Sequence, residues 1–207
     1  MENIAHSKSP LSGVCNPGGQ VFGAYSSAPG VAFAERRDLM LLSLRGKVQD
    51  AAWLERVTGA LGCELPKPCR SADSAIAGAL GLGPDEWLIV SGSDSAIAST
   101  LSARAAYVTD VSHGRACLRL SGARARDLLA KGTSIDLHPR AFQPGHCAAT
   151  ALAKISVVLH QVDASPTYDL YAMRSYTLSL WHWLTEAAAE YGYRIDPPHP
   201  GRQQALT

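Results

Sequence analysis

Strand-like and helix-like segments alternate along this chain, and the alternation occurs twice. In the first half, the apolar run of residues 39–44 has the length of a buried strand. Asp50 precedes a stretch whose apolar residues recur at helical spacing, and Gly62 follows it, so we expect a helix between these two residues. Residues 86–90 predict a second strand, entered through a turn at Pro84. This order requires a fold in which helices cover a sheet.

A second helix closes the first half. Ser93 or Asp94 can cap it, because either side chain can accept a hydrogen bond from the first turn of a helix. Ile97 and Leu101 are four residues apart and therefore lie on one face of this helix. The first half thus reads strand, helix, strand, helix.

The second half also alternates between strand-like and helix-like segments. A turn at residues 110–115 separates a strand near Tyr107 from an alternating strand at residues 117–120. A short helix over residues 123–131 follows, and Gly132 ends it. A strand that places a glycine-bounded helix over a sheet is an architectural unit rather than an obvious active site.

Two further strands and a helix complete the second half. Residues 151–160 and 168–173 have strand character, and residues 163–166 contain the Asp, Ser and Pro of a turn. Ser175 can cap a last helix, whose apolar residues keep a helical period until Gly192 ends it.

Each half supplies strands with two helices, so we expect the helices of each half to cover one sheet face. The pattern predicts an α+β fold of two ferredoxin-like βα halves, with antiparallel or mixed sheets covered by helices. The first residues are rich in Gly, Ser, Pro and Ala, which predicts an extended arm with one short strand at residues 31–34. The expected divisions are an arm at 1–37, a first half at 38–105, a second half at 106–195 and a tail at 196–207.

Bulk composition fits a globular protein and argues against several classes of function. The chain is 46% hydrophobic and 18% charged, so it can bury a sizeable core. A formal net charge of +1 gives no reason to expect nucleic acid or an anionic membrane as a partner. No segment resembles a secretory signal or a membrane span, and five cysteines without a C-x-x-C pair fit reduced thiols. We therefore expect a soluble, cytoplasmic protein.

Motifs for cofactors, metals and nucleophiles are weak. The glycine-rich residues 78–83 do not open a helix after a strand, so we interpret them as an ordinary loop rather than a nucleotide site. His138 and residues 146–147 lack the usual zinc spacings. Ser112 and His113 are sequence neighbours whose side chains rarely face each other, so they are expected to shape a turn. The sequence thus predicts no catalytic, cofactor-binding or metal-binding residue.

Arginines and tryptophans are instead candidates for a protein interface. Arg115 and Arg119 belong to a local arginine cluster, which fits a solvated or partner-facing surface. On the last helix Trp181 faces the apolar stripe and Trp183 points elsewhere, and exposed aromatic residues are common interface anchors. Packing of Trp183 against the N-terminal arm is an equal alternative. The predicted subunit-interface residues are His113, Arg115, Arg119, Trp181 and Trp183.

Short motifs spread over residues 38–193 resemble, in consistent order, the gamma subunit of heterotetrameric sarcosine oxidase. None of them is diagnostic alone, but the ordered set is fairly specific. The motifs are GPDEWL at 83–88, DVSHGRA at 110–116, LSG at 120–122, LLAKG at 128–132, IDLHP at 135–139, AF at 141–142, PGHC at 144–147, RS at 174–175 and LWHWL at 180–184.

This resemblance implies a fold like the tetrahydrofolate-binding region of the glycine-cleavage T-protein. It also implies partners: an alpha subunit, a flavin-bearing beta subunit and a small zinc-binding delta subunit. The assembly would oxidise sarcosine to glycine and hydrogen peroxide and pass a one-carbon unit to tetrahydrofolate. FAD, FMN, NAD and zinc are expected in the partner subunits and none in this chain, which would be a non-catalytic component.

Alternatives stay open at this point. A related complex acting on another N-methylated amino acid would use a similar gamma subunit. A free-standing folate-binding or aminomethyl-transfer protein is a second alternative, although no acidic and aromatic folate pattern is found. A scaffold that binds other partners through Arg115, Arg119 and Trp183 is a third. Thr133 stands where the family is expected to carry Cys, and no chemistry is assigned to that position.

Overall fold

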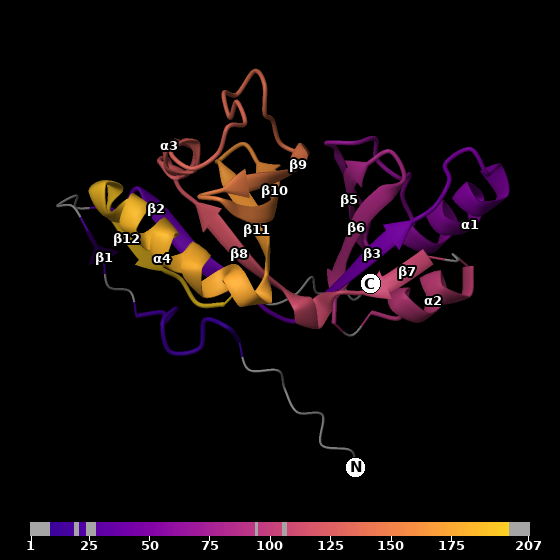
Figure 1. Ribbon diagram of the computed structural model, residues 1–207, viewed down its shortest axis with the longest axis horizontal. Coiled ribbons are helices and arrows are strands. Elements are labelled where there is room, and N and C mark those ends of the chain that lie inside the picture. Colours follow the sequence, from indigo (N-terminus) through magenta and orange to yellow (C-terminus); the bar gives the residue numbers. More distant parts are fainter. Residues whose placement is uncertain (1–8, 19–20, 24–27, 94, 105–106, 199–207) are drawn as a thin grey trace, which may run out of the picture.

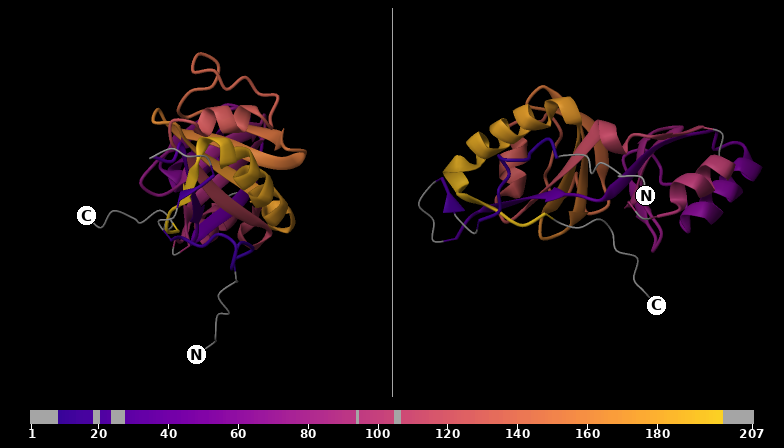
Figure 2. Two further views of the ribbon diagram at one scale, coloured as in Figure 1. Left: turned by 90° about the vertical axis from the view of Figure 1, so that its left-hand side faces the viewer. Right: turned by 90° about the horizontal axis from the view of Figure 1, so that it is seen from below.

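The computed structural model describes residues 9–18, 21–23, 28–93, 95–104 and 107–198. Two β-sheets face each other, and helices cover the outer side of each sheet (Figure 1). Seen from below, the two sheet-and-helix halves lie side by side (Figure 2). In this described part of the chain, no helix is long and apolar enough to cross a membrane.

The five-stranded sheet takes four strands from the expected first half, and all its neighbouring strands are antiparallel. Its fifth strand is the one near Tyr107, which was expected in the second half but pairs with Leu39–Arg45, so that assignment was wrong. The strands predicted at 39–44 and 86–90 are confirmed. Residues 78–83, which we expected to form a loop, are instead a strand that is buried over its first four residues, so that prediction was wrong. Across the sheet the order is β4 (Ser71–Asp73), β5 (Gly78–Gly83), β6 (Glu86–Gly92), β3 (Leu39–Arg45) and β7 (Tyr107–Asp110).

Two helices cover the outer face of this sheet, α1 (Ala51–Leu61) and α2 (Ile97–Arg104). The predicted caps of α1 are confirmed: Asp50 accepts a hydrogen bond from the Trp53 backbone N–H at 3.0 Å, and Gly62 adopts φ 70°. Ile97 and Leu101 are both buried, as predicted. Asp94, one of the two predicted caps of α2, lies outside the described residues.

The seven-stranded sheet is mixed, because β12 and β2 are parallel while every other neighbouring pair is antiparallel. The prediction of a single strand at residues 151–160 was wrong. Ala153 and Lys154 both have positive φ, 51° and 68°, and form a tight turn between two antiparallel strands. The order is β1 (Val21–Phe22), β12 (Tyr193–Ile195), β2 (Val31–Arg36), β8 (Arg115–Ser121), β11 (Thr167–Met173), β10 (Ile155–Asp163) and β9 (Cys147–Leu152).

Helices α3 (Ala125–Ala130) and α4 (Thr177–Ala188) cover the outer face of the seven-stranded sheet. The apolar stripe predicted for the last helix is confirmed, since Leu180 and Leu184 are fully buried against the sheet. Ser175 does not cap α4, because it lies within a 3₁₀ turn, Arg174–Tyr176, that leads into the helix.

The two halves share one topology. Each runs strand, helix, three strands, helix, strand, and in each the order across the sheet is second, third, fourth, first, fifth. The second half differs only in that β2 is inserted between β8 and β12 and that β1 extends the edge. The expected ferredoxin-like order has two strands between its helices, and here a third is added, β4 or β9. The internal duplication is therefore visible in the strand order.

Strand β2 comes from the stretch where an extended arm was expected. The short strand predicted at 31–34 is present and runs on to Arg36, but it lies inside the seven-stranded sheet, between β8 and β12. Its residues from Val31 to Glu35 are all buried, and Leu11 further upstream is also fully buried. The C-terminal end of the expected arm is thus a structural part of the second half.

A third apolar cluster joins the inner faces of the two sheets. Leu41 and Leu80 of the five-stranded sheet pack against Val158 and Tyr171 of the seven-stranded sheet. Side chains alternate between the two faces of a strand, so the residues two positions along from these also point between the sheets. One of those residues is the charged Asp169, and another is the titratable His160.

Candidate functional site between the sheets

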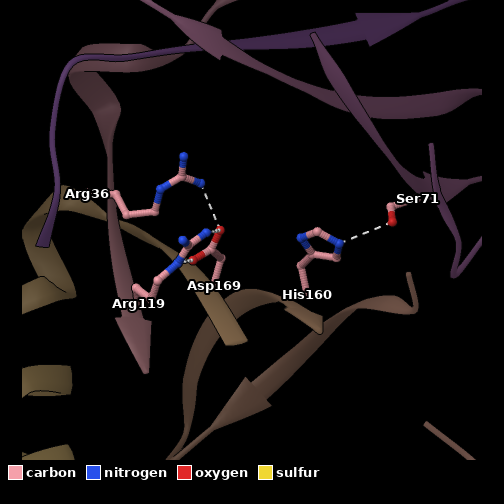
Figure 3. Close-up of polar contacts among 5 residues, drawn as sticks. All are labelled: Arg36, Ser71, Arg119, His160 and Asp169. Atoms are coloured by element: carbon pink, nitrogen blue, oxygen red, sulfur yellow. Dashed lines mark hydrogen bonds and ion pairs between the residues drawn. The ribbon is translucent and has the colours of Figure 1, made fainter. Parts of the chain in front are cut away.

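A buried ion cluster lies between the sheets, next to this apolar contact (Figure 3). Asp169 is two residues before Tyr171 on β11, so it points to the inner face. Arg119 stands directly opposite Asp169 on β8, and Arg36 ends the neighbouring strand β2. The cluster is therefore assembled by strand register across three adjacent strands.

Both arginines bind the same carboxylate. Arg119 donates from Nε to Oδ1 of Asp169 at 2.8 Å and from Nη2 to Oδ2 at 2.9 Å, while Arg36 donates from Nη1 to Oδ2 at 2.8 Å. Burial opposes ionisation of Asp169, but the hydrogen bonds from Arg119 and the charge of Arg36 outweigh it and lower the pKa of this carboxyl. Asp169 is 1% exposed, so these bonds are shielded from water.

His160 lies across the cavity from this cluster and connects the two sheets. Its Nε2 is 3.1 Å from Oγ of Ser71 on β4, and Figure 3 shows the ring turned toward Ser71 rather than toward Asp169. Burial lowers the pKa of His160 despite the nearby negative charge of Asp169. The imidazole is therefore neutral at pH 7 and adds no charge to the site.

A cavity of about 250 Å³ lies between these groups. Tyr171 lines it, and burial raises the pKa of its hydroxyl well above the ordinary value. Burial also raises the pKa of the neighbouring Cys117 thiol, so this group stays protonated and is a weak nucleophile. A fixed ion pair, a neutral histidine and a protonated thiol are suited to holding two sheets together. The Ser71 hydroxyl that His160 contacts donates to the Gly145 carbonyl oxygen at 3.1 Å.

A second hollow, which we call the hinge groove, lies where the chain crosses between the sheets. It has a volume of about 500 Å³, and Arg37, Asp38, His113, Arg115 and Arg174 are among its lining residues. The turn at residues 110–115 forms one wall, as a strand connection with a 3₁₀ turn at Ser112–Gly114.

Hydrogen bonds shape this turn. Asp110 Oδ1 accepts from the Ser112 backbone N–H at 2.8 Å, and Ser112 Oγ accepts from the Leu41 backbone N–H at 2.9 Å. Ser112 is thus a turn residue, as predicted from the sequence. Its side chain links the turn to strand β3 of the five-stranded sheet.

The structure separates the five residues predicted for an interface. His113 is exposed and Arg115 is half-buried, and both line the hinge groove. Arg119 belongs to the buried ion cluster. Trp181 is 4% exposed and contacts Phe33 edge-on, with ring centroids 5.4 Å apart, so it is a core residue of this chain.

Trp183 is half-buried and packs against Gly132, in the connection between α3 and β9. A Cβ on Gly132 would lie 2.4 Å from Cη2 of Trp183, so only glycine fits beneath this ring. Leu152 lies against the same position, since its Cδ1 would be 2.9 Å from that Cβ. Trp183 is therefore a packing residue with one open side.

The motifs examined for cofactors fall in structural positions. Residues 78–83 form β5, where a Cβ on Gly81 would meet the Lys67 carbonyl oxygen at 2.3 Å. In the described part of the chain, no three His, Cys, Asp or Glu side chains are grouped so as to hold a metal ion. All five cysteines are free thiols.

Sequence reasoning missed the ion cluster, although a signal was present. Asp169 interrupts an otherwise apolar strand, TYDLYAM, and Arg119 does the same in CLRLS. A charge in the middle of a strand that is buried on both faces requires a buried partner. The partner itself comes from strand pairing, which the local sequence does not specify.

Removal of His160 is expected to flatten the pH dependence of stability between pH 7 and 5. The folded-state pKa of His160 lies below 6.5, so its contribution is complete above pH 6.5 and is lost as the pH falls from there toward the folded value. Thermal unfolding of His160→Gln across this range measures the change, with the exposed His182→Gln as the control. A weaker slope from His146 remains, because burial also lowers the pKa of that ring. If the pH dependence of stability were unchanged in His160→Gln, this would contradict the conclusion that His160 is buried and neutral.

Comparison with known families gives a match over most of the chain. Residues 45–190 match the family described as sarcosine oxidase, gamma subunit. A sarcosine oxidase subunit gamma from an Arthrobacter species is 36% identical over 141 residues, which cover 65% of this chain and 69% of that protein.

Solved structures agree with the family match. A chain of the heterotetrameric sarcosine oxidase from Corynebacterium sp. U-96, in complex with pyrrole 2-carboxylate, has a TM-score of 0.77 and 27% identity, and covers 89% of this chain and 95% of that one. Aminomethyltransferase T of the glycine cleavage system from Bartonella henselae has a TM-score of 0.59 at 14% identity, over 79% of this chain and 50% of that one. The second likeness is one of fold alone.

Proposed function

This chain belongs to the sarcosine oxidase gamma subunit family, and we propose that it acts in the heterotetrameric enzyme as a non-catalytic component that organises the other subunits. The match over residues 45–190 carries this proposal. The site between the sheets supports it, because the polar groups there bind one another and lie in the contact between the two halves.

The partners in this proposal are an alpha, a beta and a delta subunit. FAD, FMN, NAD and zinc would be held by those subunits, and the oxidation of sarcosine and the transfer of its one-carbon unit to tetrahydrofolate would take place there. The five free thiols fit a reducing compartment, so we place the complex in the cytoplasm.

The test is to purify the chain alone and to assay it for bound flavin and for sarcosine turnover. We expect neither in the isolated chain, and both in the complex reassembled from all four subunits. Flavin or turnover in the isolated chain would contradict the non-catalytic role. Tight binding of tetrahydrofolate by the isolated chain would favour a free-standing folate-binding protein instead.

A further inference from the structure

We propose that the hinge groove docks an acidic segment of another subunit of the complex. This inference rests on the proposed function, and it adds which surface is used and what chemistry the partner presents there. The groove lies where both connections between the sheets pass, at residues 36–39 and 110–115, in the lower centre of Figure 1. A partner bound there contacts both halves of the chain at once.

The lining of the groove carries more positive than negative charge. Four arginines face it, Arg36, Arg37, Arg115 and Arg174, against two carboxylates, Glu35 and Asp38. Three of these arginines, Arg36, Arg37 and Arg174, already have partners inside the molecule. Asp169 binds Arg36, and Glu35 accepts from Nε of Arg37 at 2.8 Å.

Arg115 is the arginine that a partner would neutralise. Its guanidinium makes no ion pair or hydrogen bond with another residue in the described part of the chain, although Arg115 is half-buried and therefore partly desolvated. A half-buried guanidinium gains most from a carboxylate that it can bind through two parallel N–H groups. Aspartate or glutamate side chains of a partner segment are suited to this position.

Exposed apolar side chains adjoin the groove. Met173 stands directly opposite Arg115 in the strand register and is 51% exposed. Tyr176, in the 3₁₀ turn that begins at Arg174, is 55% exposed. Arginine, methionine and tyrosine are the residues enriched where protein interfaces are buried. A charged centre with apolar neighbours therefore fits a protein segment better than a free small anion.

Charge reversal at Arg115 tests the proposal in the assembled complex. We expect Arg115→Glu to reduce recovery of the chain with its partner subunits about tenfold, and Arg115→Lys to have a smaller effect, because lysine keeps the charge but loses the bidentate contact. The matched control is Arg140→Glu, in the exposed connection between α3 and β9, which is the loop at the top of Figure 1. Circular dichroism of each variant checks that it is folded.

The outcomes separate the two proposals. Normal recovery of Arg115→Glu with the partners would overturn the docking site while leaving the subunit assignment intact. Failure of the unmodified chain to recover any partner would overturn the subunit assignment itself.

A photocrosslinker placed at the exposed His113 identifies the occupant without relying on a charge variant. We expect a crosslink to a partner segment rich in aspartate and glutamate. A crosslink to a basic or wholly apolar segment, or none at all in the intact complex, would contradict the proposal.

Discussion

Replacement of Asp169 by alanine is expected to lower the free energy of unfolding by about 3–5 kcal/mol. The variant leaves the guanidinium groups of Arg36 and Arg119 in the contact between the sheets without their shared carboxylate. Two uncompensated charges then stay largely shielded from water, and this costs more than the loss of a surface ion pair. Urea unfolding followed by circular dichroism measures the change.

Two further variants separate the buried ion pair from ion pairs in general. Asp196→Ala removes the solvent-facing pair with Arg194, which has an Nε to Oδ1 distance of 2.7 Å, and is expected to cost less than about 1 kcal/mol. The triple variant Arg36→Met, Arg119→Met and Asp169→Leu removes all the charges and should be more stable than Asp169→Ala alone. A triple variant as unstable as Asp169→Ala would contradict this account of the cluster.

Replacement of Trp181 by alanine is expected to lower the free energy of unfolding by about 3–5 kcal/mol. The indole is buried under α4 and contacts Phe33 of β2, so its loss leaves a cavity in the centre of the second half. Thermal or urea unfolding of the isolated chain measures this directly.

The exposed Tyr176 is the matched control for Trp181. Tyr176→Ala should change stability by less than about 0.5 kcal/mol, because this side chain is 55% exposed. It should instead weaken recovery with the partner subunits. If Trp181→Ala were fully stable and defective only in assembly, the ring would be an interface anchor after all.

Local patterns predicted the helices well. In α1 the capping carboxylate of Asp50, the apolar stripe and Gly62 are all encoded within residues 50–62, and the structure confirms each of them. The strands at 39–44 and 86–90 were equally clear, because each is a continuous apolar run. The predictions that succeeded depend on contacts between residues that are close in the sequence.

The errors arose where distant segments meet. Ala153 and Lys154 form a tight turn with positive φ at both positions but lack the glycine or asparagine that usually marks one. The central place of β2 depends on pairing with β8, more than 80 residues further along the chain in every register pair. The ion cluster follows from the same pairing, so a local pattern could show that Asp169 needed a partner but not which one.

We propose that this subunit organises a complex without performing its chemistry. The most direct test is the native mass of the assembly formed when this chain is co-expressed with the alpha, beta and delta subunits. We expect a complex with one copy of each subunit, and we expect no intact assembly when this chain is omitted. An assembly of the other subunits that forms and oxidises sarcosine equally well without this chain would contradict it.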